Sequence, residues 1–246
     1  HIFVSTGEKN RARVLKFLDE TNSIVIHNGV DHKYIDSLPI TRNKALELSE
    51  NKDWGNNKIL GTISRLSPEK GILILLAAFS KAIKKIPELR LLIIGGYPEE
   101  HKGYYLEIQK LIAQENLSNC VRILGYRQDA VKILKCVDFY ISSSLSEGLP
   151  ISLLEALASR IPTIATEIVG NKDILCNSVF GVLTKPDSSE SLYKGIVKMV
   201  NLTNDELNII SKNSFNRIKN QFSINEMAVK TTLLYNQTLK KRSNKK

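Results

Sequence analysis

Glu147 and Glu155 are the only acidic residues in SEGLPISLLEALASRIPT, the segment 146–163. Glu147 precedes Gly148 after a strand-like run, and Glu155 lies about one and a half turns inside the helix expected over 150–159. A carboxylate accepts two hydrogen bonds well, which suits the vicinal hydroxyls of a ribose or a hexose. Because the helix begins beside Glu147, both carboxylates can point toward one cleft.

Glu155 also has a plainer interpretation. Ser152, Glu155 and Ser159 form a narrow polar stripe on a helix that is otherwise apolar over 151–158. Such a stripe is either the solvent-facing edge of an ordinary helix or a group aimed into a site. The pattern alone leaves both interpretations open.

Two cations lie in the loop SRLSPEKG (64–71), where Ser67 and Pro68 predict the start of a helix. Arg65 and Lys70 then lie at the positive end of the helix dipole, where a cation is unfavourable unless an anion offsets it. A phosphate would do so, bound by a planar guanidinium and a point-like ammonium. The alternative is an exposed pair of cations held apart by solvent.

Backbone groups at two other strand ends complete the candidate site. Gly95 and Gly96 end an apolar strand and let the backbone approach a ligand closely, although paired glycines also form plain turns. The amides of Gly148 and Leu149 lie just before the expected helix, whose first residue would be Pro150, so they are available as donors.

Short β-branched runs alternate with segments of helical period, the pattern of βα units around a parallel sheet. The fold class predicted is therefore α/β, a doubly wound, Rossmann-like parallel sheet, in which ligands bind at the carboxyl ends of the strands. The expected strands are 23–27, 58–64, 90–96, 120–126, 137–144, 162–167 and 181–185. The expected helices are 69–85, 101–116, 128–136, 150–159, 171–176, 189–200, 204–220 and 224–241.

Four segments are expected along the chain. HIFVST and the charged helix EKNRARVLKFLDE (8–20) form a βα unit, so residues 1–31 are expected to be the end of a neighbouring, largely missing domain. The polar segment 32–57 is expected to be a linker, and 58–200 the doubly wound domain. Residues 201–246 form a C-terminal appendage of two helices and a basic tail.

Composition limits the function classes. The 246 residues carry 35 Lys and Arg against 25 Asp and Glu, a net charge of +10 that favours anionic partners or is simply a solvated basic surface. The basic residues are scattered and not interleaved with aromatic residues, so nucleic acid is not expected as a partner. No apolar run is long enough to span a bilayer. Three cysteines without C-x-x-C spacing fit buried, reduced thiols in a cytoplasmic protein.

The stretch SEGLPISLLEALASRIPTIATEIVGNKDIL resembles the signature of the retaining glycosyltransferases of family four, in which two glutamates are separated by seven residues, as Glu147 and Glu155 are. Three further pieces match in order: VIHNGVD, GTISRLSPEKG and GVLTKPDSSESL. The resemblance covers about residues 24–200 and implies the C-terminal, donor-binding domain of a GT-B enzyme. Two positions depart from it: His27 stands where proline is usual, and GGYP replaces Gly-Asp-Gly-Pro.

The resemblance implies a role for each matching residue. Arg65 and Lys70 would hold the diphosphate of a nucleotide-sugar, and Glu155 the ribose hydroxyls. Glu147, with the amides of Gly148 and Leu149, would contact the transferred sugar. The glycine-rich turn at 95–96 would border the rest of the donor. The backbone at Tyr126 and Arg127 would border its nucleobase.

The activity implied is transfer of a sugar, with retention, from a nucleotide-sugar donor (UDP-sugar favoured) to a saccharide or lipid-linked acceptor. The sequence has no D-x-D pair, so neither a metal nor another cofactor is expected. The protein is expected in the cytoplasm, with an anionic inner membrane face as a further partner. Alternatives are a truncated or inactive nucleotide-sugar-binding module and a sugar-nucleotide epimerase of the same architecture.

Overall fold

The structure, a computed structural model, describes residues 1–16 and 23–243. Its centre is a parallel sheet of six strands in the order β5-β4-β3-β6-β7-β8. The chain therefore starts in the middle of the sheet, builds outward to one edge and returns to build the other edge, which confirms the doubly wound α/β fold. The strands are β3 (Lys58–Ile63), β4 (Leu89–Ile94), β5 (Val121–Ile123), β6 (Phe139–Ser142), β7 (Thr163–Thr166) and β8 (Val182–Thr184).

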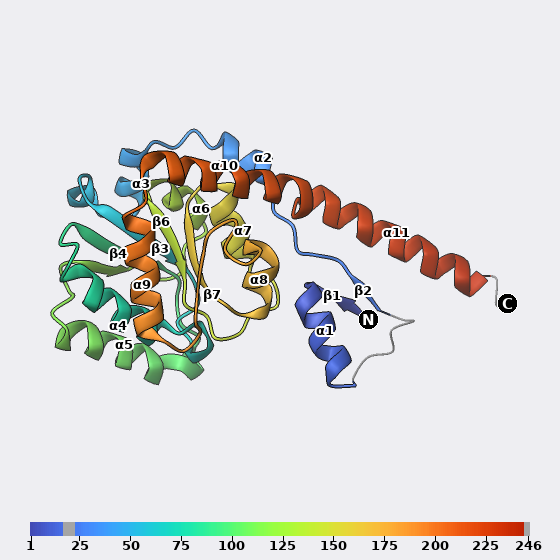
Figure 1. Ribbon diagram of the computed structural model, residues 1–246, viewed down its shortest axis with the longest axis horizontal. Coiled ribbons are helices and arrows are strands. Elements are labelled where there is room, and N and C mark those ends of the chain that lie inside the picture. The colour runs from blue at the N-terminus through green and yellow to red at the C-terminus, as the bar shows by residue number, and fades with distance from the viewer. Residues whose placement is uncertain (17–22, 244–246) are drawn as a thin grey trace.

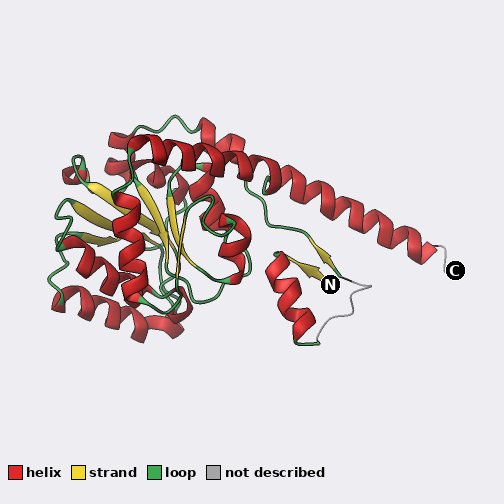
Figure 2. Ribbon diagram, viewed as in Figure 1, coloured by secondary structure: helices red, strands yellow, loops and turns green. Residues whose placement is uncertain are grey.

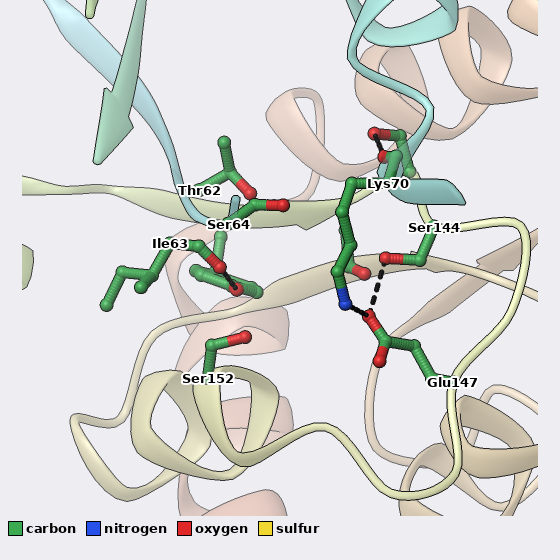
Figure 3. A pocket seen from close by; sticks show the side chains of 10 residues that line it. Thr62, Ile63, Ser64, Lys70, Ser144, Glu147 and Ser152 are labelled. Carbon is green, nitrogen blue, oxygen red and sulfur yellow. Dashed lines mark hydrogen bonds and ion pairs between the residues drawn. The ribbon is translucent and has the colours of Figure 1, made fainter. Parts of the chain in front are cut away.

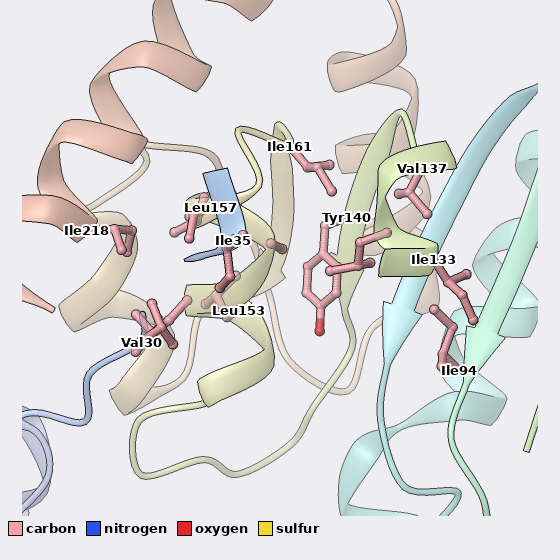
Figure 4. Packing of buried hydrophobic residues seen from close by; sticks show 14 of the residues in the cluster. Val30, Ile35, Ile94, Ile133, Val137, Tyr140, Leu153, Leu157, Ile161 and Ile218 are labelled. Atoms are coloured by element: carbon pink, nitrogen blue, oxygen red, sulfur yellow. The ribbon is translucent and has the colours of Figure 1, made fainter. Parts of the chain in front are cut away.

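Helices cover both faces of this sheet (Figure 2). One face packs against α4 (Ile72–Ile83), α5 (Lys102–Gln114) and α9 (Ser189–Val200). The other face packs against α6 (Ala130–Ile133), α7 (Ile151–Ala158), α8 (Val169–Leu175) and α10 (Asn204–Gln221). Buried strands between two helical layers have continuous apolar runs, as LLII (91–94) in β4 shows. Figure 4 shows Tyr140 of β6 packed between the sheet and the apolar side of α7.

The segment 32–57, treated above as a polar linker, is folded onto the sheet domain. It forms α2 (His32–Ser37), α3 (Arg42–Leu48) and a 3-10 turn, Lys52–Trp54. Asp31 and Thr41 cap the two helices by accepting hydrogen bonds from the amides of Tyr34 and Lys44. Its few apolar side chains enter the main core: Ile35, Ala45, Leu46 and Trp54.

A small βαβ unit stands beside the sheet domain at the amino end of the chain. It comprises β1 (Ile2–Phe3), α1 (Thr6–Val14) and β2 (Ile24–Val25), with β1 and β2 parallel. The helix expected over 8–20 thus ends at Val14, and the part of that expectation beyond residue 16 lies outside the described residues. The unit contacts α8, where the Gly7 amide donates to a carboxylate oxygen of Asp173 at 3.1 Å. Whether 1–31 belongs to another domain stays a prediction.

The appendage consists of α10 and α11 (Ile224–Ser243), and α11 projects away from the sheet domain (Figure 1). The first residues of α11 are tied to the segment that leaves β2. The amide of Val30 donates to the carbonyl of Phe222, and the amide of Ile224 donates to the carbonyl of Val30. His27 packs its ring 5.1 Å from that of Phe222, and burial lowers the pKa of His27. In the described ranges no helix has the length and apolarity needed to cross a membrane.

The cysteines are free thiols in two different environments. Cys120 and Cys136 are buried, and burial raises the pKa of Cys136 to about 11. Cys176 is exposed at the end of α8, so the expectation of buried thiols is wrong for that residue.

Candidate functional site

Lys70 is positioned by a broken turn rather than by the first turn of a continuous helix. The helix expected over 69–85 starts as a 3-10 turn, Pro68–Lys70, is interrupted at Gly71, and continues as α4. Gly71 has φ +63°, and a Cβ there would lie 2.3 Å from the carbonyl oxygen of Ser143. The turn that carries Lys70 therefore packs directly on the strand end before Glu147, which requires glycine at this position.

Lys70 and Glu147, which are far apart in the sequence, form an ion pair at the carboxyl ends of β3 and β6. The ammonium of Lys70 lies 2.6 Å from Oε1 of Glu147, and the two side chains are only 16% and 15% exposed. The hydroxyl of Ser144 donates to the same Oε1 at 2.8 Å. Figure 3 shows the three groups at one side of a small hollow. The other lining residues are Thr62, Ile63, Ser64, Tyr140, Ser142, Ser143 and Ser152.

A chain of buried polar groups holds the strand end at Ser144, and sequence reasoning missed it. The side-chain amide of Asn171 donates to the carbonyl of Thr166 at 2.9 Å, and the Thr166 hydroxyl donates to the carbonyl of Ser144. The Ser143 hydroxyl donates to the carbonyl of Lys70 at 2.8 Å. The ends of β6 and β7 and the turn before α4 are thus joined through side chains. Short hydroxyl and amide residues are common in loops, so no signal in the sequence distinguishes these from others.

Glu155 lies in a contrasting environment on α7. Its side chain is mostly buried, and among the described residues it has no hydrogen bond or ion pair. Burial alone raises the pKa of this carboxyl. Glu155 is close enough to Tyr140 for its charge to add to the burial that raises the pKa of Tyr140 to about 12. Glu155 therefore lies beside the hollow, with its hydrogen-bonding capacity unused.

Arg65 lies on the exposed rim of the same loop. Its side chain is 68% exposed, and its guanidinium lies 3.4 Å from a carboxylate oxygen of Glu69. That carboxylate accepts a 2.6 Å hydrogen bond from the Ser67 hydroxyl, which lowers the pKa of Glu69. Ser67 therefore binds a side chain and does not cap a helix. In the described ranges Glu69 is the one side-chain partner of the guanidinium, and this contact is weak and solvent-exposed, so Arg65 can reorient toward a ligand.

Gly95 and Gly96 follow β4 and lie against the start of the Arg65 loop. Gly95 has φ +153°, and a Cβ there would lie 1.8 Å from the carbonyl oxygen of Ser64. The Leu66 amide donates to the carbonyl of Gly96 at 2.8 Å. The two glycines thus permit a close approach of backbone to backbone in this structure, and contact with a ligand stays a prediction.

Tyr126 and Arg127 follow β5 on the neighbouring loop. The Tyr126 side chain is 79% exposed, and its backbone approaches Gly96. Arg127 forms two hydrogen bonds, of 2.8 and 2.9 Å, with the carboxylate of Asp129. Neither residue lines the hollow at Lys70. Their position fits contact with a more distant part of an extended ligand.

Gly148 and Leu149 lie between that hollow and the amino-terminal unit. The carbonyl of Leu149 accepts a 2.9 Å hydrogen bond from the side chain of Asn28. Helix α7 begins at Ile151, with Pro150 as the preceding cap residue. Gly148 and Glu147 also line a wider hollow of about 830 Å³, whose opposite wall includes Glu8 and Arg11 of α1 and Lys172 of α8.

Three known proteins are similar to this chain in sequence or in fold. The Escherichia coli protein named UDP-Gal:alpha-D-GlcNAc-diphosphoundecaprenol alpha-1,3-galactosyltransferase is 31% identical over 225 residues, which cover 89% of this chain and 55% of that relative. A glycosyltransferase crystal structure from Rickettsia africae matches with a TM-score of 0.89 at 28% identity, covering 97% of this chain and 63% of the other. The Anabaena protein HepE, solved with UDP and glucose, shares the fold with a TM-score of 0.86 at 22% identity, covering 96% and 62%.

These likenesses extend over only part of each relative. The chain spans about half the length of the curated relatives it matches. The family described as Glycosyl transferases group 1 matches residues 45–217, which include both glutamates, Arg65 and Lys70. The resemblance seen in the sequence is thus confirmed, and the chain belongs to the group 1 glycosyltransferases, with the Rossmann-like fold found in GT-B enzymes.

Proposed function

We propose that this chain binds the nucleotide-sugar donor of a retaining glycosyltransferase at the hollow lined by Lys70 and Glu147, with Glu155 beside it. The observation that carries the proposal is the contrast between the two carboxylates. Glu147 is held by a cation and a hydroxyl, whereas the mostly buried Glu155 has no partner among the residues that the structure describes. A mostly buried carboxylate without a partner is unfavourable by itself, and vicinal ribose hydroxyls would supply two donors to it.

The diphosphate of the donor would lie against Lys70 and Arg65. When the bond between the anomeric carbon and the diphosphate oxygen breaks, negative charge accumulates on that oxygen. Two cations at this position stabilise the developing charge without a divalent metal. Lys70 is less than one-fifth exposed, so its charge is poorly screened and acts strongly on an oxygen close to it.

Retention would follow if the acceptor hydroxyl attacks the face from which the diphosphate departs. The new bond joins the acceptor oxygen to the anomeric carbon, and the hydroxyl proton passes to an oxygen of the departing diphosphate. Glu147 then positions the sugar and acts electrostatically, and it is not the base. Its ion pair with Lys70 is consistent with this role, because the ammonium fixes the position of the carboxylate beside the diphosphate site.

The names of the known proteins favour UDP as the nucleotide. The E. coli relative is named for UDP-Gal and for a diphosphoundecaprenol-linked acceptor, and HepE was solved with UDP and glucose. We therefore propose a UDP-sugar donor and a saccharide or lipid-linked acceptor. A lipid-linked acceptor would bring the protein to an anionic membrane surface, where its net charge of +10 is favourable.

We propose further that acceptor binding needs residues beyond these 246, since the relatives are about twice as long. The wider hollow at Gly148 and Arg11 is where a facing domain would complete an acceptor site. The isolated chain is then expected to bind donor but to transfer sugar slowly, because positioning of the acceptor and exclusion of water both require that domain.

The experiment that tests the proposal is calorimetric titration of the chain with UDP, GDP and ADP, with and without EDTA. UDP should bind most tightly, and EDTA should leave its Kd unchanged. A strict requirement for magnesium or manganese would contradict the metal-independent mechanism. Absence of binding by every nucleotide would contradict the donor site itself.

A further inference from the structure

A second groove lies on the outward face of α10, at the opposite end of the sheet from the donor hollow. Phe180 lies two residues before the start of β8, at the amino ends of the strands. The groove is open to solvent and has six lining residues: Phe180, Asn213, Asn216, Arg217, Asn220 and Gln221. Four of the six carry primary amides, and none is acidic.

The amides share one face of α10 because of their spacing. Asn213, Asn216 and Asn220 stand at i, i+3 and i+7, and Gln221 ends the helix one position later. The opposite face is buried through Phe215 and Ile218. From Asn213 to Asn220 the row extends about 10 Å along the helix axis, at ~1.5 Å per residue. That length accommodates more than one sugar ring.

The amides are available for a ligand. Each primary amide offers two donors and a carbonyl acceptor. In the described part of the chain, none of these four side chains forms a hydrogen bond or an ion pair. The groove thus presents closely spaced donors and acceptors whose present partner is solvent.

Arg217 is the one charged residue in the groove lining. Its guanidinium donates to the carbonyls of Ile174 and Asp173 at 2.8 and 2.7 Å. It also lies over the ring of Phe180, 5.0 Å from the centroid. The guanidinium is thus held against the aromatic wall, and the other polar groups of the lining are neutral amides.

The loop that carries Phe180 has an unusual backbone. Cys176, Asn177 and Ser178 follow one another with φ of 49°, 53° and 71°. Three successive left-handed residues, none of them glycine, are unfavourable and persist only where surrounding contacts hold them. The Ser178 hydroxyl accepts a hydrogen bond from the Leu183 amide at 3.1 Å. Phe180, which follows these residues, is only partly buried and lies beside the amide side chains of α10.

We propose that this groove binds a neutral oligosaccharide, at a site separate from the donor hollow. A sugar ring has an apolar C–H face and vicinal hydroxyls at its edge. Phe180 offers a surface for the former, and the amide row matches the latter in number and polarity. An anionic polymer is less well suited, because the lining offers it one cation, Arg217, against four neutral amides. The inference does not depend on the donor or mechanism proposed above.

The test is saturation-transfer NMR of the whole chain with maltotetraose and chitotetraose, each at about 10 mM, which is tenfold above a Kd of ~1 mM. The informative variant is Asn216→Ala/Asn220→Ala, which removes two exposed amides without touching the core. Asn208→Ala is the matched control, because it removes an exposed amide from the same helix outside the groove. UDP titration of each variant verifies that the donor site is intact.

At least one of the two sugars should show saturation transfer, and the double variant should raise its Kd at least tenfold. The Asn208→Ala variant should bind as the unmodified chain does, and UDP affinity should be unchanged throughout. The proposal is overturned if neither sugar binds, if the double variant binds as tightly as the control, or if a sulfated oligosaccharide is preferred to both neutral ones.

Discussion

Glu147 and Glu155 lie one helix turn and a short loop apart, yet they occupy opposite electrostatic environments. Glu147 is paired with Lys70 at 2.6 Å and with Ser144 at 2.8 Å. Glu155 has no partner among the described residues, and burial raises its pKa. The first carboxylate is already satisfied by Lys70 and Ser144, whereas under the proposed function the second would gain its hydrogen bonds from the ribose of the donor.

This difference predicts opposite consequences of mutation. Replacing Lys70, the cation paired with Glu147, should lower the free energy of unfolding, because it leaves a largely buried carboxylate without its cation. Removing the charge of Glu155 should raise the free energy of unfolding and weaken ligand binding. A mostly buried, unpaired charge destabilises the folded protein until a ligand binds to it. Stability and affinity measured on the same variants therefore distinguish the two sites.

The largest effect is expected from Lys70→Met. It leaves Glu147 without its ammonium, and breaking a buried pair in this way costs roughly 3 kcal/mol. Urea denaturation measures the loss. The double variant Lys70→Met/Glu147→Gln should recover much of it, since neither charge then remains. Equal stabilities of the single and double variants would show that the ion pair is not what holds these loops.

The next largest effect is expected from Glu155→Gln, on affinity for UDP. Loss of charge-assisted hydrogen bonds of about 1.5–3 kcal/mol weakens binding about 10- to 100-fold. Calorimetry with UDP measures this loss, and Ser159→Ala on the same polar stripe serves as the control.

The stability of Glu155→Gln should show the opposite sign and depend on pH. A carboxyl whose folded pKa is raised favours the folded state below its unfolded pKa, and that contribution is lost as pH rises through the folded pKa. At pH 7 the variant should therefore melt at a higher temperature than the unmodified chain. The difference should shrink as the pH falls and disappear near pH 3, below the unfolded pKa, where the carboxyl is protonated in both states. Scanning calorimetry at the two pH values provides the check, and a lower melting temperature at pH 7 would contradict the account.

A smaller effect is expected from Thr166→Val, which removes the hydroxyl that donates to the Ser144 carbonyl. The variant keeps the shape of the side chain but leaves a buried carbonyl without that donor, at a cost of about 1–2 kcal/mol. Thr166→Ser retains the hydroxyl and should lose less. Urea denaturation compares the two, and a larger loss for the serine variant would show that the methyl group matters more than the hydrogen bond.

The smallest effect on stability is expected from Arg65→Ala. Arg65 is 68% exposed and pairs weakly with Glu69, so unfolding should change by less than about 0.5 kcal/mol. Affinity for UDP should nevertheless fall about tenfold, near 1.4 kcal/mol, if the guanidinium binds a phosphate. Unchanged affinity in this folded variant would remove Arg65 from the donor site.

The regular part of the fold could be predicted from the sequence because buried parallel strands are continuous apolar runs. The expected strands 58–64 and 90–96 correspond to Lys58–Ile63 and Leu89–Ile94. Helices α2 and α3 could not be predicted in this way. Their buried residues, such as Ile35 and Leu46, are isolated in polar sequence, so hydrophobic periodicity gives no signal.

The candidate site, like the fold, could be predicted from the sequence only in part. The chemical types at Arg65, Lys70, Glu147 and Glu155 were apparent from spacing and from the family resemblance. The ion pair between Lys70 and Glu147 was not, because it joins two loops that lie 77 positions apart. The roles of Thr166 and Asn171 were equally hidden, since their importance depends on burial and on which carbonyls lie beside them.

The most direct test of the central claim is titration of UDP and of a UDP-sugar into the unmodified chain, Glu147→Gln and Glu155→Gln, all with EDTA present. If Glu155 binds the ribose, its variant should weaken both ligands about 10- to 100-fold. The Glu147 variant should leave UDP nearly unchanged and should weaken chiefly the UDP-sugar. Equal losses of UDP affinity in the two variants, or none in either, would contradict the assignment of separate roles to the two glutamates.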